Sequence, residues 1–113
     1  MKTKILSIAV LFLFTAVTIS AMDTTDTFKV KGGDCNDCKE HIESVALNVA
    51  GVSMAHWNSE TKELRVIFDD SKTNLDDIEK AVAKAGHDTS HYKAKDVDFN
   101  KLPDCCKYDR DKD

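Results

Sequence analysis

The residues of this chain best suited to chemistry are its four cysteines, which form two local pairs. Cys35 and Cys38, here called the motif pair, are separated by two residues, whereas Cys105 and Cys106, the tail pair, are adjacent. Two thiolates with the spacing of the motif pair can converge on one ion, and soft sulfur ligands select Cu(I) or Hg(II) over hard ions such as Mg²⁺. Zn(II) prefers four ligands, so the motif pair alone would hold it poorly. The motif pair therefore predicts a soft-metal site.

The elements around the motif pair should present it at the start of a helix. Residues 27–31 alternate apolar and polar as a half-buried strand does, and Gly32-Gly33-Asp34 breaks that pattern. From Cys38 onward, apolar residues recur at helical spacing on one face, at Ile42, Val45, Ala46 and Val49. Free N–H groups and a partial positive charge at a helix N-terminus favour thiolate over thiol. We therefore expect both sulfurs at a strand-to-helix turn that promotes metal binding.

The rest of the chain predicts an α+β fold of the ferredoxin-like type. The expected elements after the first helix are strands at residues 52–57 and 64–68, a helix at 75–85 and a final strand within 87–95. Asn74 resembles the cap of the second helix and Gly86 its stop. The final strand has a weak pattern, in which only Tyr92 and Ala94 face inward. The order βαββαβ predicts a split-βαβ sandwich, followed by a C-terminal extension.

The segment Gly33-Asp34-Cys35-Asn36-Asp37-Cys38, followed four residues later by Ile42, resembles the G-M-T-C-x-x-C signature of heavy-metal-associated domains. Gly51-Val52, the 64–69 strand and Ala85-Gly86 also match, so the resemblance covers residues 28–92. That family includes copper chaperones, the amino-terminal modules of copper-transporting ATPases and the periplasmic mercury-binding protein. The resemblance implies that the motif pair binds Cu(I) or a similar soft ion and passes it on by ligand exchange, with a membrane metal transporter or exporter component as a partner.

Two positions depart from the family pattern. Gly33-Asp34 replaces the usual Met-Thr before the first cysteine, so an apolar anchor is missing and the nearby carboxylates of Asp34 and Asp37 oppose the helix terminus. His87 stands in the loop after the second helix, at the cysteine end, where the family often has Tyr or Lys. A neutral imidazole is a competent ligand, so His87 is a candidate metal contact, and the alternative is a solvent-exposed loop histidine. Surface or packing roles are expected for the other histidines, His41, His56 and His91.

The tail pair, Cys105 and Cys106, lies outside the family's domain. As metal ligands these cysteines would fold back toward the motif pair and complete a site of three or four sulfurs. As disulfides they would join the motif pair, close a strained bridge between themselves or form an independent redox pair, and an exported location favours oxidation. The apolar residues Val97, Phe99 and Leu102 predict that segment 102–108 packs back toward the end with the cysteines and His87. The charged residues 109–113 are expected to fray.

Residues 1–21 have the order of a secretory signal. Lys2 and Lys4 form a basic start, an apolar run follows from Ile5 to Ile19, and small residues precede the expected cleavage after Ala21. The run is shorter than the roughly 20 residues that span a bilayer comfortably, so a retained anchor is the weaker alternative. We therefore expect a signal peptide at 1–21, the metal-binding domain at 27–95 and the extension at 96–113. The mature protein should be periplasmic or otherwise exported, without stable membrane insertion.

Charge and the lack of a catalytic grouping narrow the function classes. The chain carries 16 basic and 20 acidic residues, and this acidic balance argues against nucleic acid and suits cations or a basic partner. The sequence has no recognisable Ser/His/Asp grouping, phosphate loop or carboxylate pair, so we expect no enzyme. One alternative remains, a thiol–disulfide redox protein, since Cys-x-x-Cys at a helix start is also a redox motif. The favoured interpretation is an exported protein that binds, buffers or hands on Cu(I), with Hg(II) or Zn(II) as alternative ions.

Overall fold

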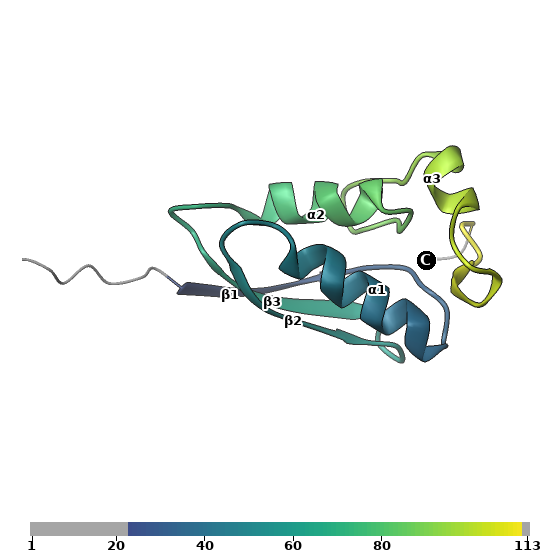
Figure 1. Ribbon diagram of the computed structural model, residues 1–113, viewed down its shortest axis with the longest axis horizontal. Coiled ribbons are helices and arrows are strands. Elements are labelled where there is room, and N and C mark those ends of the chain that lie inside the picture. Colours follow the sequence, from purple (N-terminus) through teal and green to yellow (C-terminus); the bar gives the residue numbers. More distant parts are fainter. Residues whose placement is uncertain (1–22, 112–113) are drawn as a thin grey trace, which may run out of the picture.

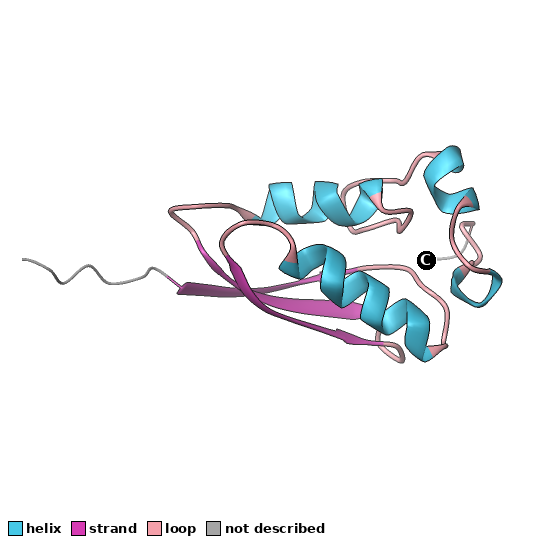
Figure 2. Cartoon of the chain, in the orientation of Figure 1, coloured by secondary structure: helices cyan, strands magenta, loops and turns pink. Residues whose placement is uncertain are grey.

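Three antiparallel strands form the sheet of this protein, in the order β1-β3-β2. The computed structural model describes residues 23–111, so the predicted signal segment at residues 1–21 lies outside the described part. The strands are β1 (Asp23–Lys29), β2 (Val52–Asn58) and β3 (Glu63–Asp69). Helices α1 (Asn36–Leu47) and α2 (Leu75–Lys84) both lie over one face of this sheet (Figures 1 and 2). This arrangement confirms the predicted α+β fold class.

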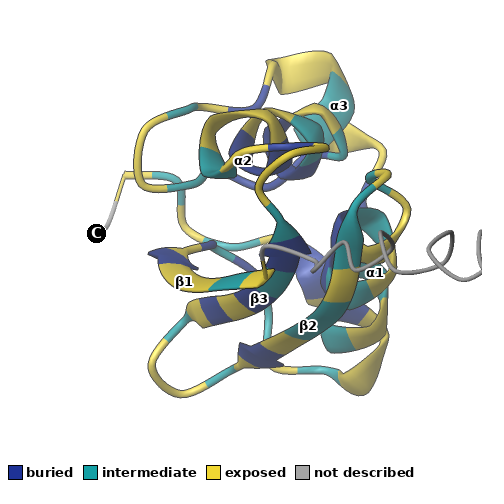
Figure 3. Ribbon diagram, turned by 90° about the vertical axis from the view of Figure 1, so that its left-hand side faces the viewer, coloured by how far each residue is buried: buried dark blue, intermediate teal, exposed yellow. Residues whose placement is uncertain are grey.

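The buried core lies between that face of the sheet and the two helices. Side chains alternate along each strand, so Phe28 of β1 packs inward opposite Leu64 of β3, while Arg65 is exposed. Val66 and Phe68 continue the buried row of β3, and Figure 3 shows this alternation as dark and light bands along the strand. The period-2 pattern that predicted these strands is therefore the pattern that fills the core.

Helical spacing gives α1 and α2 their inward faces. The buried positions include Cys38, Ile42 and Ala46 on α1 and Ile78, Val82 and Ala83 on α2. As predicted, Asn74 caps α2, because its side-chain oxygen accepts a hydrogen bond from the Asp77 N–H at 2.8 Å. Gly86 follows the helix with a φ of 112°, a conformation that residues with a side chain rarely adopt. Within residues 23–111, no helix is both long enough and apolar enough to cross a membrane.

The final strand predicted within residues 87–95 does not form. The segment makes one isolated antiparallel bridge, from Val30 to Thr89, so the described sheet has three strands. Local hydrogen bonding explains the difference, because the Thr89 N–H donates to the Tyr92 carbonyl at 2.8 Å and folds the segment into a turn. The buried carboxylate of Glu79 on α2 also accepts hydrogen bonds from the Thr89 hydroxyl and the His91 N–H. The segment pairs with the chain at the end of β1 only briefly, where the Lys31 N–H donates to the Asp88 carbonyl at 2.9 Å and the Ser90 N–H to the Lys29 carbonyl at 3.1 Å. The bonds to Tyr92 and Glu79 then turn it toward α2.

The C-terminal extension returns to the domain and joins its core. It contains α3 (Asp96–Asn100) and a 3-10 turn, η2 (Asp104–Cys106), which contacts α1. Leu102 is only 5% exposed and packs in the same buried cluster as Cys106, with Phe99 against it. The predicted return of the extension is confirmed for these residues. It is wrong for Val97, which is 58% exposed, because residues two apart in a helix point to opposite sides.

Replacing Leu102 with Ala should lower the free energy of unfolding by about 2–4 kcal/mol, because the truncation leaves a cavity between the extension and the core. The matched control is Val97→Ala, whose exposed site should change that free energy by less than about 0.5 kcal/mol. Urea unfolding of the oxidised proteins, followed by the fluorescence of buried Trp57, measures both values. Equal, small losses in the two variants would show that the extension does not pack as described.

Candidate metal centre

The motif pair lies where the chain enters α1. Cys35 is the N-cap residue of α1, and its carbonyl accepts a hydrogen bond from the Cys38 N–H at 3.1 Å. Cys38 is 0% exposed, whereas Cys35 is half-buried. Because Cys38 belongs to the inward face of α1, helix packing holds one sulfur of the pair inside the core and leaves the other at its edge.

Each motif cysteine forms a disulfide with one tail cysteine. Cys35 is bonded to Cys105 and Cys38 to Cys106, with Cα–Cα separations of 6.0 and 5.3 Å. Of the alternatives that the sequence left open, the structure shows bridges to the motif pair and no bridge within the tail pair. Cys105 is exposed and Cys106 is 0% exposed. We therefore call Cys35–Cys105 the outer disulfide and Cys38–Cys106 the inner disulfide.

The four sulfurs occupy one small region. The sulfurs of Cys35, Cys105 and Cys106 all lie within 4.8 Å of one another, and Cys38 adjoins this group through its bond to Cys106. In the part of the chain that the structure describes, no other group of three His, Cys, Asp or Glu side chains brings its ligand atoms so close together. Thiolates at these positions could converge on a soft ion. The sulfur cluster is therefore the candidate metal centre.

The extension touches Gly33 in the loop between β1 and α1 (residues 30–35), here called the cysteine loop. A Cβ atom at this position would lie 1.8 Å from the carbonyl oxygen of Cys105 and 3.1 Å from the Cα of Cys106. The overlap with the backbone oxygen of Cys105 is impossible, so any residue with a side chain here would force the extension to shift. The departure from the Met of the family signature thus has a structural reason, which is that the tail backbone fills the space of a side chain.

Lys62 also contacts the cysteine loop. Its ammonium donates to the Gly32 carbonyl at 2.9 Å and to a carboxylate oxygen of Asp34 at 3.2 Å, and it lies 5.3 Å from the centre of the Trp57 ring. The Asp34 carboxylate beside the motif pair therefore has a cationic partner. Lys62 lies in the turn between β2 and β3, and its position in the sequence gives no sign of this contact.

His87 is buried and hydrogen-bonded at both ring nitrogens. Its Nδ1 lies 2.7 Å from the Lys31 carbonyl, so Nδ1 carries the proton and donates it. Its Nε2 then accepts from His41 Nδ1 at 3.2 Å. Burial lowers the pKa of His87 to about 4, against the opposing effect of its bond to Lys31, so the ring is neutral at pH 7. The alternative of a solvent-exposed loop histidine is therefore wrong.

The structure does not place any histidine in the sulfur cluster. His41 contacts His87 rather than facing solvent alone, and it is the histidine whose role the sequence underestimated. His56 and His91 are exposed, as expected, and lie beside the carboxylates of Glu43 and Glu79. The proposed ligand role of His87 therefore depends on a rearrangement that frees its Nε2.

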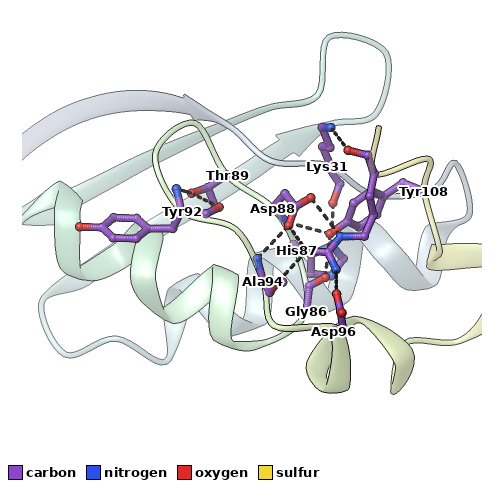
Figure 4. A network of polar contacts seen from close by, with 10 residues as sticks. Lys31, Gly86, His87, Asp88, Thr89, Tyr92, Ala94, Asp96 and Tyr108 are labelled. Atoms are coloured by element: carbon purple, nitrogen blue, oxygen red, sulfur yellow. Dashed lines mark hydrogen bonds and ion pairs between the residues drawn. The ribbon is translucent and has the colours of Figure 1, made fainter. Parts of the chain in front are cut away.

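A polar clamp at Asp88 fixes the last part of the extension (Figure 4). Arg110 donates from Nη2 to Asp88 Oδ1 at 2.7 Å and from Nη1 to Asp96 at 2.8 Å. The hydroxyl of Tyr108 donates to the Gly86 carbonyl at 2.9 Å and accepts from the Asp88 N–H at 2.8 Å. Arg110 is thus ordered, and the expectation that residues 109–113 fray is wrong for it. The charged sequence hid this role because only the fold brings Asp88 and Arg110 together.

The electrostatics of the clamp follow from its burial. Burial alone would raise the pKa of Asp88, but the hydrogen bonds from Arg110 and from the Ala94 N–H outweigh it and lower that pKa below the ordinary value of an aspartate. Burial also raises the pKa of Tyr108 to about 12, so its hydroxyl keeps the proton that it donates to Gly86. Both groups therefore hold the clamp closed at neutral pH.

Asp88→Asn should lower the free energy of unfolding by about 2 kcal/mol at pH 7, since a hydrogen-bonded carboxylate is lost from a buried site. A carboxylate whose folded pKa is lowered stabilises the fold above its unfolded pKa, and this contribution is lost as pH falls through the lower, folded value. The difference in the free energy of unfolding between Asp88→Asn and the unmodified protein should therefore shrink below about pH 4. Urea unfolding of both proteins between pH 2 and 7 measures this difference.

The control is Asp96→Asn, because Asp96 also binds Arg110 but its side chain is 95% exposed. Its effect on stability should be small at every pH, as for other exposed ion pairs. A loss at Asp88 that does not change with pH would contradict the assignment of the clamp to the charged carboxylate.

Comparison with known proteins agrees with the site and the fold. The sequence model of the Heavy-metal-associated domain matches residues 27–88. The copper chaperone CopZ of Staphylococcus epidermidis is 32% identical over 65 residues, which are 58% of this chain and 96% of that protein. The mercuric transport protein periplasmic component of Pseudomonas aeruginosa is 36% identical over 70 residues, 62% of this chain and 77% of that protein. The solved structure of oxidized MerP from Ralstonia metallidurans CH34 matches at a TM-score of 0.56 and 35% identity, covering 60% of this chain and 94% of its own.

The matched region contains the end of β1, all of β2 and β3, both main helices and the motif pair, and it stops before the extension. The tail pair and Arg110 therefore lie outside what the family model describes, although they contact residues within it. With the motif pair at the N-terminus of α1 over an antiparallel sheet, this chain belongs to the heavy-metal-associated domain family and is a metal-handling protein.

Proposed function

We propose that the reduced protein binds a soft metal ion, with Cu(I) favoured and Hg(II) or Zn(II) as alternatives, through the thiolates of Cys35 and Cys38. The observation that carries this proposal is the position of the motif pair at the N-terminus of α1, beside two further sulfurs. Free N–H groups at a helix N-terminus stabilise thiolates, and thiolates prefer soft ions. Disulfide sulfurs offer no thiolate, so binding requires prior reduction of both bridges.

We further propose that the tail pair adds ligands to the reduced site. Cys105 and Cys106 hold their sulfurs close to Cys35 while the extension is docked, so little movement is needed to bring a third or fourth thiolate to the same ion. Two thiolates suit an open site from which metal is exchanged, whereas three or four enclose the ion and slow its release. This donor set favours a carrier or buffer that retains its metal. His87 is a further candidate, at a greater distance from the sulfur cluster.

The place of action that fits these features is an exported compartment. A secretory signal at residues 1–21 would deliver the mature domain there, and an oxidising compartment is where structural disulfides persist. The acidic surface suits cations and a basic protein face rather than nucleic acid. A membrane metal transporter or exporter component is the proposed exchange partner. The relatives include a copper chaperone and a mercuric transport protein, and these names favour a carrier over an enzyme or a redox catalyst.

Changing both Cys35 and Cys38 to Ser should abolish tight binding of Cu(I) and Hg(II) by the reduced protein, because hydroxyls are hard and stay protonated. Anaerobic titration with a competing chelator, comparing Cu(I), Hg(II) and Zn(II), measures binding and ranks the ions. Far-ultraviolet circular dichroism checks that the fold is kept. Full affinity in the double variant would move the site elsewhere and remove the basis of the proposal. The oxidised, unmodified protein is the second control and should bind none of the three ions tightly.

Changing both Cys105 and Cys106 to Ser should leave metal binding in place but weaken it by about tenfold or more, because pre-positioned ligands act at high effective concentration. Transfer of Cu(I) from the reduced variant to a chelator should be correspondingly faster. The variant keeps the Asp88 clamp, so it separates loss of ligands from loss of the docked extension. Unchanged affinity and transfer rate would limit the tail pair to forming disulfides.

A further inference from the structure

The two disulfides differ in their access to solvent. Cys105 of the outer disulfide is exposed and Cys35 is half-buried, whereas both cysteines of the inner disulfide are 0% exposed. A disulfide is reduced by direct attack of a thiolate on one of its sulfurs, so access decides which bridge reacts. A reductant in solution reaches the outer disulfide, and the folded protein shields the inner one.

A short gap between sulfurs joins the two bridges. The Sγ atom of Cys35, in the outer disulfide, lies 3.8 Å from the Sγ atom of Cys106, in the inner disulfide. This separation is close to sulfur–sulfur contact, so a thiolate released at Cys35 starts next to the sulfur that it must attack. We propose that Cys35 relays reduction from the outer to the inner disulfide, and that this relay opens the whole sulfur cluster to metal.

The chemistry balances with two equivalents of a dithiol reductant. The first dithiol supplies two electrons to the outer disulfide through a mixed disulfide at Cys105, is itself oxidised to a disulfide, and leaves Cys35 and Cys105 as thiols. The Cys35 thiolate then attacks Cys106, the bond to Cys38 breaks, and Cys38 leaves as a thiolate that takes up a proton. This exchange moves no net electrons. A second dithiol reduces the new Cys35–Cys106 bridge through the half-buried sulfur of Cys35, which completes four thiols from four electrons.

Cys105 is a poorer relay than Cys35, although its sulfur is also near Cys106. Attack by Cys105 would form a disulfide between adjacent residues, whose Cα atoms are about 3.8 Å apart across a trans peptide. Ordinary disulfides need a Cα–Cα separation of about 4.4–6.8 Å. A bridge between Cys35 and Cys106 joins separate segments that already lie against each other at Gly33, and it carries no such constraint.

The docked extension keeps the relay intramolecular after the first bridge is broken. The inner disulfide still ties Cys106 to α1, and the Asp88 clamp and buried Leu102 hold the chain on either side of the tail pair. Reacting groups held in this way behave as if at very high concentration, so exchange at Cys106 should outpace attack by any dissolved thiol on the shielded bridge.

The consequence for metal rests on the proposed function. In the oxidised protein the four sulfurs are paired in the two disulfides, and none of them is a free thiol. A dithiol reductant that reaches only the outer disulfide would, through Cys35, release Cys38 and the buried half of the site. Metal loading would then follow the supply of reductant as well as the supply of metal.

Two single variants test the relay without any metal present. Cys105→Ser and Cys35→Ser both remove the outer disulfide and keep the inner one, but only Cys105→Ser leaves the Cys35 thiol beside Cys106. At the same low concentration of dithiothreitol, iodoacetamide should modify Cys38 at least about tenfold faster in Cys105→Ser than in Cys35→Ser. Mass spectrometry identifies the modified cysteine. Equal rates in the two folded variants would overturn the relay. Circular dichroism and Trp57 fluorescence establish that each variant is folded.

The unmodified protein gives a measurement that does not depend on the folding of a variant. After reduction by one equivalent of dithiothreitol and quenching with acid, the species with two free thiols should include the Cys35–Cys106 bridge. Only the original Cys38–Cys106 bridge in that species would overturn the relay.

Failure of the relay would leave Cu(I) binding by the fully reduced protein intact. Failure of the proposed function would instead appear as an absence of Cu(I) binding, with the thiol exchange rates unchanged. The two proposals therefore fail separately.

Discussion

The backbone of the C-terminal extension crosses the cysteine loop at Gly33, where no side chain fits beneath the Cys105 carbonyl. This close approach brings the tail pair to the N-terminus of α1 and lets each tail cysteine reach a different motif cysteine. A bulky residue at position 33 would push the extension away and separate the two pairs. The missing Met of the family signature and the added cysteines beyond the family domain are therefore two parts of one arrangement.

Covalent and non-covalent forces hold the extension at different points. The disulfides fix the tail pair, while Leu102 before it is buried in the core and Arg110 after it binds Asp88. The disulfides depend on redox conditions, whereas the clamp depends on the charge of a carboxylate whose pKa is lowered and is therefore closed at neutral pH. Because the two kinds of anchor respond to different conditions, reduction can free the sulfurs without releasing the segment that carries them. This separation suits the proposed metal site, which forms only after reduction.

The groups around the sulfur cluster mainly shape the loop that carries it. Lys62 binds the Gly32 carbonyl and the Asp34 carboxylate, so the negative charge beside Cys35 is offset. His87 is neutral and donates to the Lys31 carbonyl just before the loop, while His41 of α1 occupies its other nitrogen. A buried neutral imidazole bonded at both nitrogens is held in one orientation and one tautomer. In the described state its contribution is to fix the Lys31 backbone against α1.

The sequence by itself determined the motif pair at the start of a helix, the inward faces of both main helices and the alternation of the sheet, because these depend on spacing along a short stretch of chain. It also showed the resemblance that the family match later confirmed. Only the tertiary structure decided the partner of each cysteine, the burial of His87, the loss of the final strand and the clamp between Asp88 and Arg110. The partners of the cysteines, the burial of His87 and the clamp depend on which distant segments meet, as the extension meets the cysteine loop at Gly33 and Arg110 meets Asp88. The final strand is lost because Thr89 bonds to Tyr92 and to Glu79 of α2, and its weak pattern gave no sign of these bonds.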